Sequence, residues 1–225
     1  ICGSYSGGGN QKDDVLLIKT NSTGVEQWTN TFFGNNYDES GYCVQQTTDG
    51  GFIICGTKYN TYSEVLLIKT DGNGNPLWNK TYGNPYSNNG NYVEQTTDGG
   101  YIICGNHNSN VYLIKTDSQG DTLWTNTFGD NTHSESSYCV QQTTDGGFII
   151  CGDKTLSPWN TDGDVYLIKT DGNGNITSTF NIPTSSNRKL EKVVDVLGRE
   201  TKPQKNTPFI EIYNDGSTEK KIVIE

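Results

Sequence analysis

The chain has 225 residues, a formal net charge of -10, six cysteines and no methionine, and 31% of its residues are hydrophobic. Nucleic acids and anionic membranes attract proteins mainly through Lys and Arg, so this acidic balance argues against both as partners. No run approaches the roughly 18 apolar residues of a membrane span, so we expect a soluble protein without membrane insertion.

The most informative feature is an internal repeat. The segment 49–56, Asp-Gly-Gly-Phe-Ile-Ile-Cys-Gly, returns in nearly the same form at 98–105 and again at 145–152. The chain opens on Ile1-Cys2-Gly3, which is the tail of a fourth copy. A period of about 50 residues is typical of propeller blades and related arrays.

Each full unit contains four short runs rich in β-branched and aromatic residues, which predicts four strands. In the second full unit these runs are 91–97, 101–104, 111–116 and 122–128. Asp98-Gly99-Gly100 joins the first two runs, and Gly readily takes the positive φ that hairpin turns require. No stretch of the repeat region has a sustained helical period, so the sequence predicts an all-β fold.

Four antiparallel strands in a unit of this length make up a propeller blade. We therefore expect a β-propeller-like array over residues 1–182, with a partial blade at 1–34 and blades at about 41–83, 91–129 and 137–180. The turn between the first two strands resembles that of NHL-type propellers, which implies strands numbered from the centre outward. Because closed propellers use about four to eight blades, we expect further blades before Ile1.

The cysteines fall at repeat positions. An antiparallel pairing across the Asp-Gly-Gly turn brings Cys43 close to Cys55 and Cys139 close to Cys151. Two cross-strand disulfides are therefore one interpretation, and they would indicate an oxidising compartment. The other, of equal weight, is that all six cysteines are small buried apolar residues.

A calcium loop is the most tempting metal motif. Asp71-Gly72-Asn73-Gly74-Asn75, repeated at 171–175, places oxygen ligands at alternate positions. The motif lacks the sixth-position Gly and the twelfth-position Glu of an EF-hand, so a turn that needs Gly explains it better and calcium is the alternative. The two histidines lie in loops and Cys-x-x-Cys is not found, so we expect no metal site and no cofactor.

Motifs of catalysis are also missing from the sequence. It contains no Gly-x-Ser-x-Gly elbow, phosphate loop or His-Glu-x-x-His. Paired carboxylates such as Asp13 with Asp14 lie in polar segments and are interpreted as solvated surface. We therefore expect that the chain has no catalytic residues and is not an enzyme; a polysaccharide-active hydrolase or lyase with an acid pair at a channel mouth is the alternative.

Strand alternation places the variable loops of all units on one rim of the array. Binding residues concentrate on loops held by a rigid scaffold, and aromatic rings stack well on sugars or peptides. This rim is therefore a candidate binding surface for an extracellular glycan or protein, unless its loops are merely unconstrained. The candidate residues are Tyr5, Tyr37, Tyr59, Tyr62, Tyr86, His133 and Trp159.

The chain changes character after the repeats. Residues 183–191 read as a linker, and 192–225 contain three predicted strands near 192–199, 208–213 and 220–225, which form a small β segment. Such a sheet is marginally stable by itself.

This last segment resembles the C-terminal sorting domain, type A, of type IX secretion substrates in Bacteroidetes, and matches its back half. The resemblance implies export across the outer membrane and recognition by the type IX secretion machinery, followed by release or attachment at the cell surface. The residues that carry it are Leu197, Gly198, Arg199, Gly216, Lys220, Lys221 and Ile222.

The leading hypothesis is therefore a secreted or surface-attached propeller that serves in binding or adhesion. One alternative is a structural spacer beside a catalytic domain encoded upstream. A second is the propeller hydrolase or lyase named above.

Overall fold

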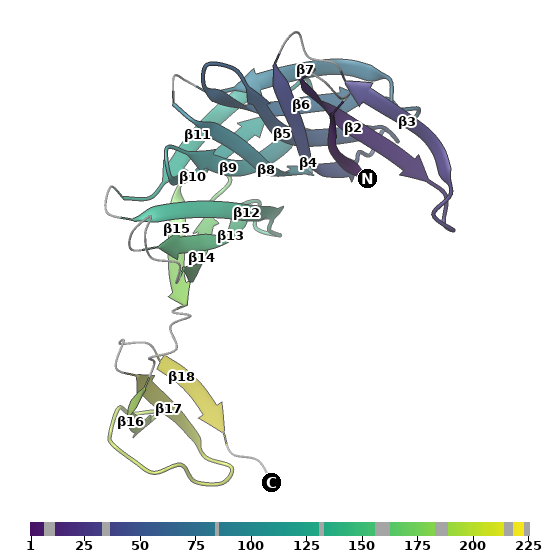
Figure 1. Cartoon of the computed structure of the whole chain (residues 1–225). Helices are drawn as coiled ribbons and strands as arrows, with labels where there is room; N and C mark the ends of the chain where they lie inside the picture. The colour runs from purple at the N-terminus through teal and green to yellow at the C-terminus, as the bar shows by residue number, and fades with distance from the viewer. Residues whose placement is uncertain are drawn as a thin grey trace.

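The structure is a computed structural model that describes residues 1–6, 12–32, 37–83, 86–130, 133–155, 163–182, 189–213 and 218–222. All regular elements in these ranges are strands, and no described segment forms a helix that could cross a membrane. The prediction of an all-β fold built from four-stranded antiparallel sheets is confirmed. The sheets of the repeat region follow one another along a propeller-like arc (Figure 1).

The strands pair in chain order within five sheets. The first sheet has three strands: β1 (Cys2–Ser6), β2 (Asp13–Thr20) and β3 (Glu26–Phe32). The second has four: β4 (Asp38–Gln46), β5 (Phe52–Tyr59), β6 (Ser63–Thr70) and β7 (Pro76–Tyr82). The third has β8 (Asn88–Gln95), β9 (Tyr101–His107), β10 (Asn110–Thr116) and β11 (Thr122–Phe128). The fourth has β12 (Ser134–Gln142), β13 (Phe148–Thr155), β14 (Asp164–Thr170) and β15 (Ile176–Ile182). The fifth has β16 (Leu190–Asp195), β17 (Pro208–Tyr213) and β18 (Thr218–Ile222).

The core of the repeat region lies between sheets, and each interface uses one face from each neighbour. Burial of the alternating apolar residues of both faces is the main stabilising term. Between the first and second sheets, Val15, Leu17 and Phe32 pack with Ile54, Leu66 and Ile68. Between the second and third, Ile53, Cys55, Val65, Leu67 and Tyr82 pack with Val93, Tyr101, Ile103 and Ile114. Between the third and fourth, Ile102, Cys104, Val111, Leu113 and Phe128 pack with Val140, Phe148, Ile150 and Ile168.

A tryptophan on the last strand of each of the first three sheets reinforces these interfaces. Trp78 of β7 lies edge-on to Tyr101 of β9, with ring centroids 6.0 Å apart. Trp28 meets Phe52 and Trp124 meets Phe148 in the same way. Edge-to-face pairs of this kind add to the energy of area burial, so these rings connect neighbouring sheets.

The turn between the first two strands of each full sheet carries a repeated ion pair. Asp49 accepts hydrogen bonds from the Thr47 hydroxyl and the Gly51 amide, while Gly50 has a φ of +82° that favours glycine. The buried Lys69 ammonium lies 2.9 Å from the Asp49 carboxylate and also donates to the Thr70 carbonyl. Lys115 with Asp98 and Lys169 with Asp145 repeat this arrangement.

The fourth sheet departs from the repeat on its last strand. Ser178 pairs with Lys169 in the position that Trp28, Trp78 and Trp124 occupy in the other sheets. Phe180, which is 58% exposed, stands in the position of Asn30 and Asn126. At these two positions the fourth sheet therefore presents a serine and an exposed phenyl ring, and it lacks the indole of the other sheets.

The fifth sheet has a small core of its own. Val194 and Phe209 are buried, and Asp195 accepts hydrogen bonds from the Leu197 and Arg199 amides and the Arg199 side chain. Figure 1 shows this sheet apart from the arc of the other four.

Candidate functional site

A bulge interrupts the first strand of each full sheet at one repeat position. The register shifts between Gly41 and Cys43 in β4, between Gly90 and Tyr92 in β8, and between Ser137 and Cys139 in β12. A bulge leaves one residue unpaired and turns its side chain out of the regular ladder. The unpaired residues are Tyr42, Asn91 and Tyr138, which we call the inner row because β4, β8 and β12 lie on the inner side of the arc (Figure 1).

The tyrosines of the inner row are exposed and fixed by their hydroxyl groups. Tyr42 is 48% exposed, and its hydroxyl lies 2.9 Å from that of Tyr59. Tyr138 is 58% exposed and donates to Asp153 Oδ1 at 3.0 Å. In the middle sheet, Asn91 donates to the Ser137 carbonyl at 2.7 Å. The row thus presents two aromatic faces on either side of an amide.

Two phenols at this row, those of Tyr59 and Tyr138, have raised pKa values. The bond to Tyr42, followed by burial, raises the pKa of Tyr59 to about 12. Burial and then the bond to Asp153 raise the pKa of Tyr138. The Tyr59 and Tyr138 hydroxyls thus stay protonated over a wider pH range, and a phenol O–H can both donate and accept a hydrogen bond.

A second repeated feature lies where each first strand begins. A buried polar residue of the first strand pairs there with a basic residue of the second strand, in register across the ladder. We call these the rim pairs, because they lie at the rim that carries the variable loops. They are Glu39 with Lys58 (3.1 Å), Asn88 with His107 (2.6 Å) and Glu135 with Lys154 (3.0 Å).

The third rim pair belongs to a larger cluster. Lys154 lies 3.0 Å from both Glu135 and Asp130, and His133 Nδ1 lies 2.7 Å from Asp130. Burial lowers the pKa of Lys154, but the bonds to Glu135 and Asp130 outweigh it and the net pKa is raised. One ligand atom from each of Asp130, His133 and Glu135 lies within 4.8 Å of the others, a spacing that could hold a metal ion. The Lys154 ammonium forms ion pairs with both carboxylates and offsets one of their two negative charges.

The predicted rim tyrosines lie at the surface. Tyr5, Tyr59, Tyr62 and Tyr86 are exposed, and Tyr37 is half-buried beneath the Lys58 ammonium, 5.0 Å from its ring centroid. Tyr86 packs edge-on to His107 at 5.7 Å. Trp159 lies outside the described residues. The structure thus joins Tyr59 to the inner row, and Tyr37 and Tyr86 to the rim pairs.

The candidate disulfide partners face each other across the ladder. Cys43 pairs with Cys55 and Cys139 with Cys151, and all four are free thiols. Cys55 is buried, whereas Cys139 and Cys151 are exposed. Burial raises the pKa of Cys55 well above its ordinary value. The register that a cross-strand disulfide requires is present in both pairs. The interpretation that all six cysteines are buried does not hold for Cys139 and Cys151, which are exposed residues of the fourth sheet.

The Asp-Gly turns that resemble a calcium loop are closed by their own hydrogen bonds. Asp71 Oδ1 accepts from the Asn73 and Asn75 amides, and Oδ2 accepts from the Asn75 side chain at 2.8 Å. Asp171 makes the same contacts. These carboxylates therefore stabilise turns.

The residues that carry the sorting resemblance occupy the fifth sheet. Leu197 is 74% exposed, and Gly198 has a φ of +82° in the turn after β16. Arg199 binds back to Asp195 at 2.7 Å. Lys220, Lys221 and Ile222 belong to β18, and Gly216 lies outside the described residues.

Sequence reasoning missed the inner row and the rim pairs. Tyr42, Asn91 and Tyr138 read as ordinary strand residues, because a bulge leaves no mark in an alternating pattern. Their common place relative to the Asp-Gly-Gly turn was the one available signal.

No family model and no curated protein matches the chain. The solved structures that match the chain include two crystal structures of chimeric proteins. A crystal structure of an ACO/RPE65 chimera has 12% identity and a TM-score of 0.45, over 93% of this chain and 57% of that one. The monoclinic form of a point variant of that chimera has 12% identity and a TM-score of 0.47, over 94% and 55%. The chain thus spans little more than half the length of those proteins.

These structures correct one sequence-based expectation. The chimeras are enzymes of the carotenoid oxygenase and isomerase type, so the expectation that the chain is not an enzyme is wrong as a general exclusion. The likeness concerns the fold alone and assigns no activity to this chain.

Proposed function

We propose that the chain is a secreted or cell-surface binding protein, and that its ligand is a neutral glycan or a polar peptide segment held along the inner row. The observation that carries the proposal is the repeated bulge, which presents Tyr42 and Tyr138 as exposed rings at equivalent positions of different sheets. Bulges are over-represented next to functional sites because they redirect a side chain.

The chemistry of the row favours a ligand with both apolar faces and hydroxyl groups. Tyrosine rings stack on the C–H faces of sugars, while the neutral phenols and the amide of Asn91 exchange hydrogen bonds. The formal net charge of -10 disfavours a strongly anionic ligand. Each rim pair joins the start of a first strand to the end of the second strand of the same sheet, which supports the strands that carry the inner row.

In this proposal the four-stranded sheets are propeller blades. The sheets β4–β7, β8–β11 and β12–β15 are three blades, and β1–β3 is an incomplete one. Face-to-face packing of successive sheets supports this interpretation.

Binding is tested by screening the chain against an array of neutral oligosaccharides and measuring hits by calorimetry. Tyr42→Ala with Tyr138→Ala should weaken binding at least tenfold, because stacking on each ring contributes about 1 kcal/mol or more. Tyr42→Phe should keep the stacking and lose only the hydroxyl contact. The matched control is Leu77→Ala, which removes an equally exposed apolar side chain from the outer strand β7.

Full affinity in the double alanine variant, together with an unchanged stability, would exclude the inner row as the site. A screen in which no glycan or peptide binds the wild-type chain more tightly than the double variant would also reject the proposal.

We further propose that the fifth sheet directs export by the type IX secretion machinery. The supporting observation is the exposed turn at Leu197-Gly198-Arg199, which the Asp195 carboxylate holds in place. A reporter fused to residues 183–225 should reach the medium of a Bacteroidetes host that has this system. Replacement of Leu197 and Arg199 by Ala should retain it in the cell, whereas Leu190→Ala, at an exposed residue outside the turn, should not. Export of the reporter without the segment would contradict the proposal.

A further inference from the structure

The first sheet has an unpaired edge at β1. In the three full sheets the strand equivalent to β1 pairs on both sides, so that β5 lies between β4 and β6. β1 pairs with β2 alone. An edge strand presents backbone N–H and C=O groups that can bind another extended segment.

A glycine on β1, Gly3, lacks the Cβ that would block the close approach of a neighbouring strand. At Gly56, Gly105 and Gly152, an added Cβ would lie 1.8 Å from a carbonyl oxygen of the first strand, so only glycine fits. Gly3 occupies the same repeat position, yet nothing lies within 4 Å of its Cβ site. The first sheet thus keeps the glycine although the strand that would require it is not among the described residues.

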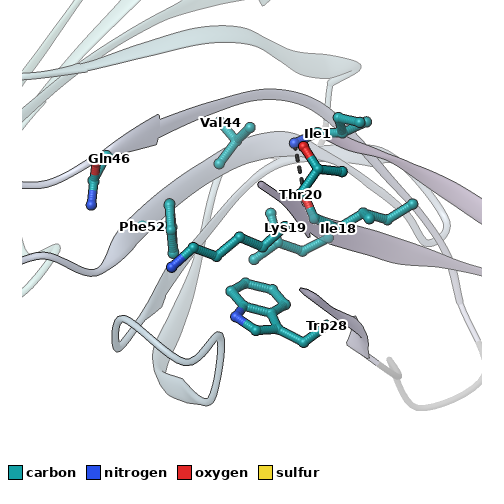
Figure 2. A pocket seen from close by; sticks show the side chains of 9 residues that line it. Ile1, Ile18, Lys19, Thr20, Trp28, Val44, Gln46 and Phe52 are labelled. Atoms are coloured by element: carbon teal, nitrogen blue, oxygen red, sulfur yellow. Dashed lines mark hydrogen bonds between the residues drawn. The ribbon is translucent and has the colours of Figure 1, made fainter. Parts of the chain in front are cut away.

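A lysine on β2 shows the same mismatch. Lys69, Lys115 and Lys169 each pair with an aspartate from the turn after the first strand. Lys19 holds the equivalent position in β2, and its ammonium lies about 6 Å from the ring centroids of Trp28 and Phe52. Figure 2 shows this side chain extended between the two rings.

The space beside Lys19 is a cavity of about 310 Å³. Its lining includes Ile1, Lys19, Trp28, Gln46 and Phe52 (Figure 2). At the next interface the corresponding pocket contains Thr48 and Asp49 beside Lys69 and Trp78. At the second interface, Thr48 and Asp49 come from the end of that sheet's own first strand and its turn, whereas no such described residue lines the pocket beside Lys19.

We propose that the β1 edge binds a fourth strand whose sequence is that of the repeat's own first strand, running antiparallel to β1 and ending in an Asp-Gly turn. Three features select this occupant: the open backbone edge of β1, the glycine that allows close approach at Gly3, and the cation at Lys19 that calls for a carboxylate. The described first strands β4, β8 and β12 are each already paired, so the occupant is an additional copy of this segment.

The chemistry of the occupant follows from the repeat. A backbone carbonyl lies over Gly3, as that of Ser40 lies over Gly56. Its aspartate reaches Lys19, as Asp49 reaches Lys69. A small residue faces Cys2, as Cys43 faces Cys55. Apolar residues of the occupant pack against Val44 and Phe52, which line the cavity.

The test uses a synthetic peptide with the sequence of residues 38–53, blocked at both ends and carrying Cys43→Ser to prevent mixed disulfides. These residues cover the first strand β4, the Asp-Gly-Gly turn and the first two residues of β5. We expect saturable binding of this peptide to the full chain by fluorescence anisotropy, and slower amide hydrogen exchange in β1 on binding. A peptide of the same composition in scrambled order should not bind.

Gly3→Val is the discriminating variant. Its side chain meets nothing in the unbound chain, so its stability should match that of the wild type. It should weaken peptide binding more than tenfold, because the Cβ blocks the approach of the peptide carbonyl. Equal binding to Gly3→Val and to the wild type would overturn the proposal.

The ion pair is tested by a double-mutant cycle. Lys19→Met in the chain and Asp49→Asn in the peptide should each weaken binding severalfold, and together no more than either change alone. Independent effects would show that Lys19 does not bind the aspartate. No detectable binding of the wild-type peptide, with β1 exchange unchanged, would also reject the proposal.

Discussion

Trp124 of β11 meets Phe148 of β13 edge-on, with ring centroids 5.9 Å apart and an interplanar angle of 62°. The two rings belong to different sheets and lie next to the apolar cluster between them. Because each of these tryptophans packs against a ring of the following sheet, each interface can be weakened separately.

Trp124→Ala should lower the free energy of unfolding by about 2–3 kcal/mol, through the loss of a large half-buried ring and its aromatic pair. Chemical denaturation followed by circular dichroism measures this change. Leu123→Ala is the control, because Leu123 is 58% exposed on the same strand and should cost under about 0.5 kcal/mol. Similar losses from both variants would show that the indole does not connect the sheets.

Lys69→Met should be more destabilising than Lys19→Met. The buried Lys69 ammonium binds Asp49 and the Thr70 carbonyl, so its removal should cost about 1 kcal/mol, since Asp49 can regain water. Lys19 has no aspartate among the described residues, and methionine can keep its contact with Trp28. Thermal unfolding of the two variants provides the comparison. Equal losses would mean that the ion pair contributes nothing.

The same turns should make the chain sensitive to acid. Hydrogen bonds from Thr47, Lys69 and Gly51 lower the pKa of Asp49 to about 2. A carboxylate whose folded pKa lies below its unfolded value of about 3.9 contributes stability above that value and loses it as the pH falls. Stability should therefore drop between about pH 4 and pH 2.

Asn substitutions supply the control for this acid effect. Asp49→Asn together with Asp98→Asn keeps the side-chain oxygen that accepts the turn hydrogen bonds and removes the titration. The doubly substituted chain should be less stable at pH 7 and should lose less stability between pH 4 and pH 2. A wild-type slope in this variant would point to other carboxylates.

The exposed and the buried cysteines should differ in reactivity. Cys139 and Cys151 are exposed, so alkylation of the native protein should label both. Cys55 and Cys104 should stay unlabelled until the chain unfolds, since both are buried and burial raises the pKa of Cys104 to about 12. Peptide mass spectrometry assigns the sites. Labelling of Cys55 at the rate of Cys151 would contradict the packing of β8 over β5.

The repeat architecture could be predicted from the sequence, because the patterns that indicate it are local. The Asp-Gly-Gly turns and the uninterrupted run at 52–55 identify hairpins and doubly covered strands without knowledge of distant contacts. The antiparallel register that sets Cys43 opposite Cys55 follows from the turn alone.

The candidate site was harder to predict from the sequence, because it depends on bulges that interrupt the regular strand pairing. Tyr42 leaves the ladder through a bulge, and Lys58 reaches Glu39 only after that bulge has shifted the register. The sequence also gives no measure of which sheet face is covered. Val65 is fully buried and Val165 is 36% exposed, although the two stand at the same repeat position.

Ser178 and Phe180 bear on how an array of this kind could be lengthened. A further blade placed against β15 would find no indole to meet its second strand and no asparagine to donate to its turn, as Asn30 donates to the Gly74 carbonyl and Asn126 to that of Gly174. Its interface would therefore be weaker than those inside the arc. Engineering a longer array would therefore begin with Ser178→Trp and Phe180→Asn, which restore at this boundary the pair of side chains found on β3 and β11.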